Sequence, residues 1–112
     1  MLAGTAEKRY FAWSGHEIEV DEAGFIQQPG LWNTELAQAL ACTDGVSELT
    51  NHHWRVIDYI RNYYREFEVA PMVRKLCKET GFSLEEIYDL FPSGPAKGAC
   101  KVAGLPKPTG CV

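Results

Sequence analysis

The sequence predicts an α+β domain that is mostly helical, a compact helical bundle with an N-terminal β-hairpin and a flexible C-terminal arm. Aromatic and β-branched residues between positions 9 and 20 flank a short turn that contains glycine, which is typical of a hairpin. Apolar side chains between positions 33 and 102 recur at steps of three and four, the spacing of amphipathic helices. The segment after Gly104 has two prolines and one glycine in six residues and no periodicity, so we expect an arm there.

The chain of 112 residues is long enough for one domain that needs no disulfide or metal to fold. We expect a disordered N-terminus over residues 1–8, a globular core over 9–103 and a mobile arm over 104–112. The net charge of −4 gives no reason to expect nucleic acid or an anionic membrane as a partner. No apolar run approaches the roughly 18–20 residues that span a bilayer, and the N-terminus lacks the features of a secretory signal. The expected location is therefore the cytoplasm, where thiols are mostly reduced.

The hairpin is expected from Arg9–Trp13 and Glu17–Val20, joined by a turn at Ser14–His16. A further turn is expected at Asp21–Gly24, and Gln27–Gly30 ends the region. Everything that follows in the core is expected to be helical.

Two helices with clear start signals come first. Asn33 or Thr34 can cap a helix that runs to about Cys42 and is stopped by an Asp-Gly pair. Thr50 can cap the longest helix, over about residues 51–68. Its apolar stripe predicts one inward face, made by Trp54, Ile57, Ile60, Tyr64 and Phe67.

Two shorter helices follow. Pro71 suits the first turn of a helix that runs to about Thr80. Ser83 and Glu86 have the spacing of a capping box, which starts another helix that Pro92 ends. The side chains expected on the apolar faces of these helices are Val73, Leu76 and Cys77 in the first, and Leu84, Ile87, Tyr88 and Phe91 in the second.

The four cysteines differ in their surroundings. Cys77 lies on an apolar helix face and Cys42 at a helix end, so both are expected to pack as small hydrophobic side chains. Cys100 lies in one more short helix, expected over residues 96–102. Cys111 is one residue from the C-terminus, where almost nothing could bury it, and an exposed thiol is open to oxidation and exchange.

Cys100 and Cys111 together predict redox or sulfur-transfer chemistry. The eleven residue steps from one to the other reach at most ~36–40 Å when extended, and a flexible linker of that length spans roughly 17–20 Å. The arm can therefore fold back until the two sulfurs touch, or project outward. A disulfide would stabilise the chain by about 3 kcal/mol in the chain-entropy model, but a bridge on a mobile arm adds little to the core. Attack on sulfur passes through a mixed intermediate that a second thiol resolves, so we expect Cys111 to attack and Cys100 to resolve.

Two other kinds of site are less well supported. Metal binding is not expected because there is no Cys-x-x-Cys pair, and the spacing of the cysteines from His52 and His53 fits no zinc site. Both histidines are expected on a partly exposed helix face. Residues 50–91 could form a helix-turn-helix joined at Val69–Pro71, which keeps a DNA-binding regulator as an alternative. Acidic residues offset the basic ones in this stretch, so such binding would depend on shape alone.

Several segments resemble one known family. The most specific is the C-terminal motif, made of Leu90–Cys100 and Gly104–Val112. The match extends backwards through Ala70–Arg74, His53–Trp54, Leu49–Thr50 and Val20–Phe25. Over roughly residue 9 to the end, the chain is similar to the DsrC/TusE family and more so to its DsrC branch.

This resemblance implies a small helical fold with an N-terminal hairpin and a mobile C-terminal arm. It implies that the arm enters a cleft of dissimilatory sulfite reductase, formed by the alpha and beta subunits, and brings Cys111 toward the siroheme. Cys111 would take up a partly reduced sulfur, and Cys100 would close on it to give a trisulfide. A membrane-bound reductase complex would then release sulfide. The siroheme belongs to the partner, so no cofactor is expected on this chain, which would be a sulfur-carrying co-substrate and not an enzyme.

The resemblance also supplies an alternative. The TusE branch relays persulfide sulfur between sulfurtransferases for tRNA thiolation, and it characteristically keeps only the penultimate cysteine. The presence of Cys100 favours the DsrC branch. The sequence gives Lys97, Lys101 and Lys107 no defined role, although each could hold the arm against an anionic site. The direction of sulfur flux, sulfite reduction or sulfur oxidation, stays open.

Overall fold

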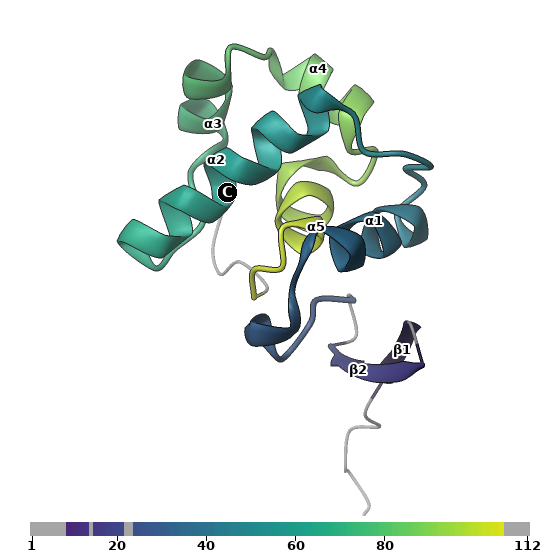
Figure 1. Ribbon diagram of the computed structural model, residues 1–112. Coiled ribbons are helices and arrows are strands. Elements are labelled where there is room, and N and C mark those ends of the chain that lie inside the picture. Colours follow the sequence, from purple (N-terminus) through teal and green to yellow (C-terminus); the bar gives the residue numbers. More distant parts are fainter. Residues whose placement is uncertain (1–8, 14, 22–23, 107–112) are drawn as a thin grey trace, which may run out of the picture.

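The computed structural model describes residues 9–13, 15–21 and 24–106, and it confirms the expected fold class of a mostly helical domain with an antiparallel hairpin (Figure 1). The expected disordered N-terminus and the last six residues lie outside the described part. No described helix has the length and apolar character needed to cross a membrane. The elements in chain order are β1 (Arg9–Trp13), β2 (His16–Val20), the 3-10 turn η1 (Pro29–Leu31), α1 (Thr34–Thr43), α2 (Asn51–Phe67), α3 (Val73–Thr80), α4 (Leu84–Leu90), the π-helical turn η2 (Pro95–Ala99) and α5 (Cys100–Val102).

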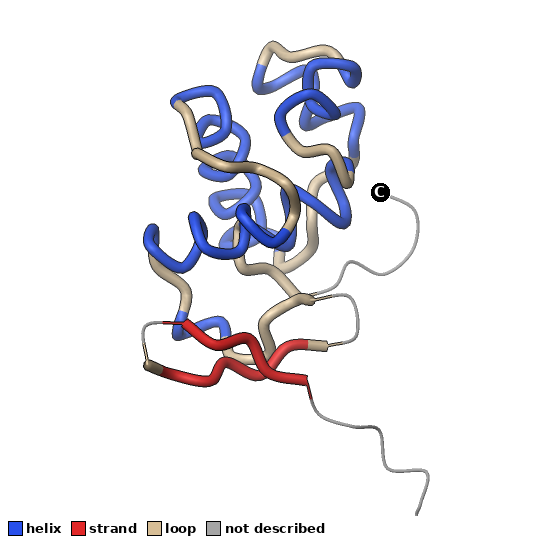
Figure 2. The backbone as a smooth tube through the Cα atoms, turned by 90° about the vertical axis from the view of Figure 1, so that its right-hand side faces the viewer, coloured by secondary structure: helices blue, strands red, loops and turns tan. Residues whose placement is uncertain are grey.

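The hairpin forms as expected and lies at one end of the molecule, with the helices beyond it (Figure 2). Its antiparallel register turns Ile18 into the core, where the residue is 1% exposed. After β2 the chain turns back, because the Phe25 amide donates to Asp21 Oδ1 at 2.9 Å and Val20 forms a bridge with Ile26. This turn buries Phe25 and Ile26 and joins the hairpin to the helical core.

The predicted starts of α1, α2 and α4 are confirmed. Asn33 caps α1, since its side-chain oxygen accepts from the Leu36 amide at 2.8 Å. Thr50 caps α2. Ser83 and Glu86 form the predicted capping box of α4, each side chain bonding the other residue's backbone amide at 3.1 and 2.9 Å. Side-chain acceptors satisfy amides that have no partner inside the helix, which is why these sequence signals are reliable.

The apolar stripe of α2 is buried only in its middle. Ile57 and Ile60 are fully buried, Trp54 and Tyr64 are partly buried against the core, and Phe67 is 52% exposed. Phe67 is the last residue of the helix, so the prediction that it faces inward was wrong. The fully buried face of α2 consists of His53, Val56, Ile57 and Ile60.

The start of α3 differs from the expectation for Pro71. The helix begins at Val73 with Met72 at its N-cap, so Pro71 precedes the first turn and is itself buried. Leu76 is buried as predicted, and Cys77 is partly buried against the core. A helix face only eight residues long can bury few side chains, and Leu76 occupies its centre.

In α4, the inward face is narrower than predicted. Ile87 and the following Phe91 are fully buried, whereas Leu84 and Tyr88 are 46% and 50% exposed. The Tyr88 ring lies against Gly94, where an added Cβ would be 3.0 Å from the ring. Tyr88 therefore packs over the turn that follows α4 and does not enter the core.

The C-terminal turns η2 and α5 form the centre of the helical part, with α1 on one side and α2 on the other (Figure 1). Val102 and Ala103 have no exposed surface, and Leu105 is 3% exposed. The packed core thus extends through Leu105, two residues beyond the expected boundary at 103. Composition alone suggested an arm from Gly104, but the chain first folds back on itself there.

Candidate functional site

Cys100 is the first residue of α5 and is buried, at 3% exposure. The turn that ends α5 closes over its backbone. Gly104 has a φ of +79° and donates its amide to the Lys101 carbonyl at 3.0 Å, while the Leu105 amide donates to the Cys100 carbonyl at 3.1 Å. These two bonds form a Schellman motif, which requires a left-handed residue such as glycine at this position. Cys100 is therefore held in a short helix whose last turn bonds back to it.

Two side chains from distant parts of the chain hold the end of α5. Trp32 Nε1 donates to the Val102 carbonyl at 2.8 Å, and Arg61 Nη1 donates to the Ala103 carbonyl at 2.7 Å. The Arg61 guanidinium also stacks on the Trp32 ring, at 3.7 Å from its centroid. A Cβ on Gly104 would lie 2.3 Å from Trp32 Cδ1, so only glycine allows this close approach. We call Trp32 and Arg61 the carbonyl clamp.

A polar cluster fixes the other side of α5. Lys101 Nζ lies 3.2 Å from Asp44 Oδ1 in an ion pair that is largely buried, and Ser93 Oγ donates to the same oxygen at 2.6 Å. Asp44 Oδ2 lies close to Gly98, because a Cβ added to Gly98 would be 3.1 Å from this oxygen. This cluster ties α5 to the end of α1. It gives Lys101 a structural role, whereas the Lys97 side chain is exposed and Lys107 lies outside the described residues.

Burial sets the chemistry of the Cys100 thiol. Desolvation raises its pKa to about 12, because a thiolate would lose its water without gaining a compensating charge. At neutral pH, Cys100 in this conformation is a protonated thiol and a poor nucleophile. Reaction at its sulfur therefore requires a local opening of the residues that cover it.

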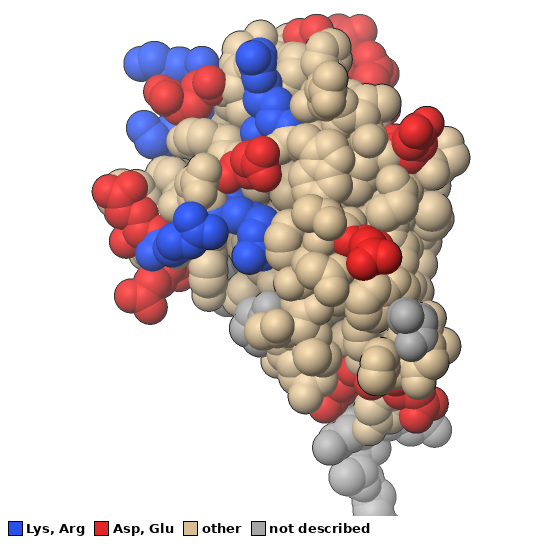
Figure 3. Space-filling view, in the orientation of Figure 1, with Lys and Arg blue, Asp and Glu red and all other residues tan. Residues whose placement is uncertain are grey.

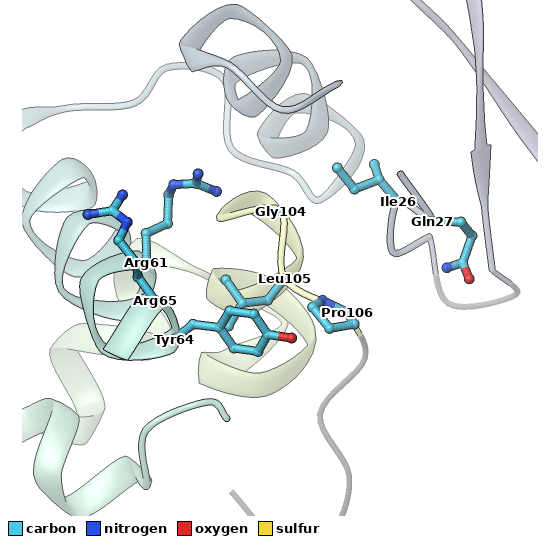
Figure 4. A pocket seen from close by; sticks show the side chains of 8 residues that line it. All are labelled: Ile26, Gln27, Arg61, Tyr64, Arg65, Gly104, Leu105 and Pro106. Atoms are coloured by element: carbon cyan, nitrogen blue, oxygen red, sulfur yellow. The ribbon is translucent and has the colours of Figure 1, made fainter. Parts of the chain in front are cut away.

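A pocket lies beside Pro106, the last residue that the structure describes (Figure 4). It has a volume of about 300 Å³ and is bordered by the loop after the hairpin, by α2 and by the segment that follows α5. Two of its lining side chains are cationic and none is anionic. The lining residues are Ile26, Gln27, Arg61, Tyr64, Arg65, Gly104, Leu105 and Pro106. This cationic pocket and the buried thiol together make up the candidate site.

The structure describes only one of the two cysteines predicted to carry the chemistry. Cys100 is anchored as expected, and Cys111 lies outside the described residues, so their juxtaposition stays a prediction. Cys42 is exposed at the end of α1, contrary to the packing role expected for it, and Gln38 Nε2 lies 3.6 Å from its sulfur. No local pattern pointed to Arg61 or Trp32, because their bonds join residues 42 and 70 positions apart.

The two histidines differ from each other. His52 is exposed and packs against Phe82, as expected for a partly exposed face. His53 is buried: the Thr50 amide donates to Nδ1 at 3.0 Å, which leaves Nε2–H to donate to the Leu90 carbonyl at 2.8 Å. Burial lowers the pKa of His53, which favours the neutral ring that both bonds require. The expectation of partial exposure was wrong for His53, whose side chain completes the capping box with Thr50.

The tight helix-helix turn lies later than expected. Three residues, Gly81–Ser83, join α3 to α4, whereas the expected joint at Val69–Pro71 is a longer loop. In a helix-turn-helix the second helix enters the DNA groove. Here that helix exposes Glu85, Glu86 and Asp89 and carries no basic residue. Lys and Arg gather instead toward the side where α2 and α3 lie, with acidic side chains among them (Figure 3).

Comparison with known proteins places this architecture. The chain is a small α+β domain with a helical core, a two-stranded hairpin and a buried cysteine in its last described helix. The family model described as "DsrC like protein" matches residues 12–112, and the chain belongs to that family.

Curated relatives and solved structures agree with this assignment. The gamma subunit of dissimilatory-type sulfite reductase from Nitratidesulfovibrio vulgaris is 50% identical over 100 residues, covering 89% of this chain and 95% of the relative. The sulfurtransferase TusE of Escherichia coli is 39% identical over 107 residues, covering 89% and 97%. The crystal structure of the oxidized gamma subunit (DsrC) from Archaeoglobus fulgidus has a TM-score of 0.83 at 44% identity and covers 93% of this chain and all of that one.

Proposed function

We propose that this protein is a sulfur carrier and a co-substrate of dissimilatory sulfite reductase in the cytoplasm, with Cys111 as the acceptor and Cys100 as the resolving thiol. The observation that carries the proposal is the position of Cys100, buried and anchored in the turn from which the chain runs on to a second cysteine eleven positions later. The similarity to a sulfite reductase gamma subunit supports the choice of partner.

The proposed chemistry balances with two thiols. The partner reduces sulfite by two electrons to an S(II) species. The Cys111 thiol displaces one hydroxyl group from this sulfur as water, and the Cys100 thiol displaces the other, which leaves one sulfur atom bridging the two cysteines as a trisulfide. Four further electrons and four protons, supplied by a membrane-bound reductase complex, release sulfide and restore both thiols. The siroheme acts in the partner, and this chain supplies only the two sulfurs.

The burial of Cys100 imposes an order on these steps. Cys111 loads first, because Cys100 is protonated and covered in the packed conformation. The second bond forms only when a local opening exposes the Cys100 sulfur, which is buried in the packed conformation. A resolving thiol that is hidden until the arm is loaded avoids a premature Cys100–Cys111 disulfide.

Intact mass after turnover with reductase and sulfite tests the proposal. The native chain should gain one sulfur atom and lose two hydrogens. Cys111→Ala should gain nothing, and Cys100→Ala should load sulfur without forming an intramolecular bridge. Cys42→Ala is the matched control for an exposed thiol outside the site and should behave as the native chain does. Sulfur loading that survives loss of Cys111 contradicts the proposal.

A persulfide relay is the second candidate, supported by the 39% identity to the sulfurtransferase TusE. In a relay only Cys111 is needed, so Cys100→Ala would retain full transfer of sulfur to an acceptor protein. Co-purification separates the two: a siroheme-containing complex that accompanies the protein supports the co-substrate role, and sulfurtransferases alone support the relay.

A further inference from the structure

We propose that a groove along α3 is the docking site for an acidic amphipathic helix of a protein partner. The groove has a volume of about 790 Å³ and lies between α3 and the first residue of α4. Both helices are at the end of the molecule away from the hairpin (Figure 1). We call this hollow the α3 groove. The inference goes beyond the proposed function, because it concerns the body of the molecule and involves neither Cys100 nor Cys111.

Apolar side chains that the core does not use gather in the α3 groove. Met72, Val73 and Leu84 line it, and Met72 and Leu84 are 66% and 46% exposed. Exposed apolar side chains scattered singly over a surface are ordinary, whereas apolar side chains gathered in one hollow mark an interaction site. Methionine is flexible and polarizable, so it adapts its shape to a partner. The groove therefore offers a place for the apolar anchor residues of another protein.

The charge of the α3 groove is positive. Arg74, Lys75 and Lys78 line it, and no acidic side chain does. Among the described residues none of these three cations forms an ion pair. Burial raises the pKa of Tyr59 on α2, and the Glu79 carboxylate raises it further, which places Glu79 toward α2 and not in the groove. The groove thus combines an apolar lining with cations that lack a counter-charge, and a segment with apolar and acidic side chains complements both.

The spacing of the cations fits a helix. Arg74 and Lys78 are four positions apart, so they lie about one turn apart on one side of α3. Carboxylates four positions apart on a partner helix have the same spacing, since both helices rise by about 5.4 Å per turn. A helix that lies along α3 can therefore pair its acidic edge with these cations while its apolar face enters the groove, which is a common mode of peptide recognition.

Nucleic acid fits this surface less well. Phosphates would pair with the cations and leave Met72 and Leu84 uncovered. A duplex seated on α3 would also approach α4, which exposes Glu85 and Asp89. These two acidic side chains do not line the groove, so they do not oppose a single helix bound inside it.

The test is a 15N NMR titration of the full-length, reduced chain without sulfur or reductase. The probe is a synthetic amidated peptide of leucine, alanine and glutamate, about 18 residues long and patterned as an amphipathic helix with an acidic edge. A peptide of the same composition in scrambled order is its control. The amide shifts of Val73, Lys75, Lys78 and Leu84 report occupation of the groove and give the Kd.

Docking predicts that the patterned peptide shifts these amides and binds about tenfold more tightly than the scrambled one. Arg74→Glu should weaken binding about fivefold, because it replaces an attraction by a repulsion. An acidic residue in the first turn of α3 is favourable to the helix, so this variant keeps the fold. Lys97→Glu, the same charge change at an exposed residue outside the groove, should leave the Kd unchanged.

A second pair of variants tests the apolar lining. Met72→Ser should weaken binding about fivefold, because it removes apolar surface that the peptide covers. Leu31→Ser, at an exposed apolar residue that does not line the groove, should have no effect.

Equal binding of the two peptides overturns the proposal, and so does unchanged affinity in Arg74→Glu and Met72→Ser. A DNA duplex that shifts the groove amides more strongly than the patterned peptide, at the same ionic strength, would make the surface a nucleic-acid site instead. Groove shifts that depend on the concentration of the protein alone would make a second copy of this chain the occupant. The sulfur-carrier proposal is unaffected by each of these results, since no step of the titration uses the arm cysteines.

Discussion

At the scale of single residues, burial decides what the reactive side chains can do. Cys100 and Cys42 are both free thiols, yet Cys100 is buried with its pKa raised to about 12, and Cys42 is exposed. The sequence predicted a packing role for Cys42 and a resolving role for Cys100, and neighbours along the chain did not predict this difference in exposure. The difference arises from the neighbours that cover each sulfur, and these come from other elements.

His53 gives a pH-dependent prediction. Its folded-state pKa lies below the ordinary value of 6.5, so the unfolded chain binds the proton more readily than the folded one. The contribution of His53 is fully present above pH 6.5 and is lost as the pH falls through the folded-state pKa. Urea unfolding should give a lower free energy of unfolding at acidic pH than at pH 7.5.

Two variants assign this pH dependence. His53→Gln should be less stable at pH 7.5 and should show a smaller decrease on acidification, since glutamine does not titrate. His52→Gln, at the exposed neighbour, should keep the native pH dependence. An unchanged decrease in His53→Gln would assign the effect to other groups.

At the scale of elements, the C-terminal turn is the part of the fold that positions the site. Short helices such as α5 do not persist alone, because nucleation is unfavourable. Here the carbonyl clamp and the Asp44–Lys101 ion pair supply the tertiary contacts that hold it. Gly104 and Leu105 are therefore held in place even though the composition of this segment suggests mobility.

Gly104→Ala tests this turn. A left-handed φ costs a residue with a Cβ ~1–2 kcal/mol, and the clash with Trp32 adds the cost of overpacking, typically ~1–3 kcal/mol. We expect a loss of about 2–5 kcal/mol in the free energy of unfolding, measured with urea, and faster alkylation of Cys100.

Gly81→Ala is the matched control for Gly104→Ala. Gly81 has nearly the same φ, +83°, but nothing lies within 4 Å of its added Cβ. It should lose only the conformational cost of ~1–2 kcal/mol. Similar losses for the two variants would show that the approach of Trp32 to Gly104 does not matter.

At the scale of the whole molecule, the distribution of charge bears on the partner. The α3–α4 pair has the tight turn of a helix-turn-helix, but its second helix is acidic where DNA phosphates would approach. Phosphate contacts supply most of the affinity for DNA. We therefore expect a protein partner.

A shift assay checks this expectation. The protein should bind duplex DNA no better than weakly at physiological salt, and Arg74→Gln with Lys75→Gln should change nothing. Salt-dependent binding that those substitutions abolish would support the regulator instead.

The sequence by itself determined the hairpin, the helix starts at Asn33, Thr50 and Ser83, and the family. These features depend on neighbours within a few residues: alternation in strands, side-chain acceptors for unpaired amides, and a long contiguous motif. Local physics acts in the same way in any fold, so it can be read from the chain.

Only the tertiary structure decided the site around Cys100. Trp32 and Arg61 reach the end of α5 from 70 and 42 positions away, and His53 is buried because Leu90 lies against it. The burial of the thiol and the cationic pocket both follow from these distant contacts. No periodicity or motif encodes them, because packing between elements is set by how all of the faces fit together.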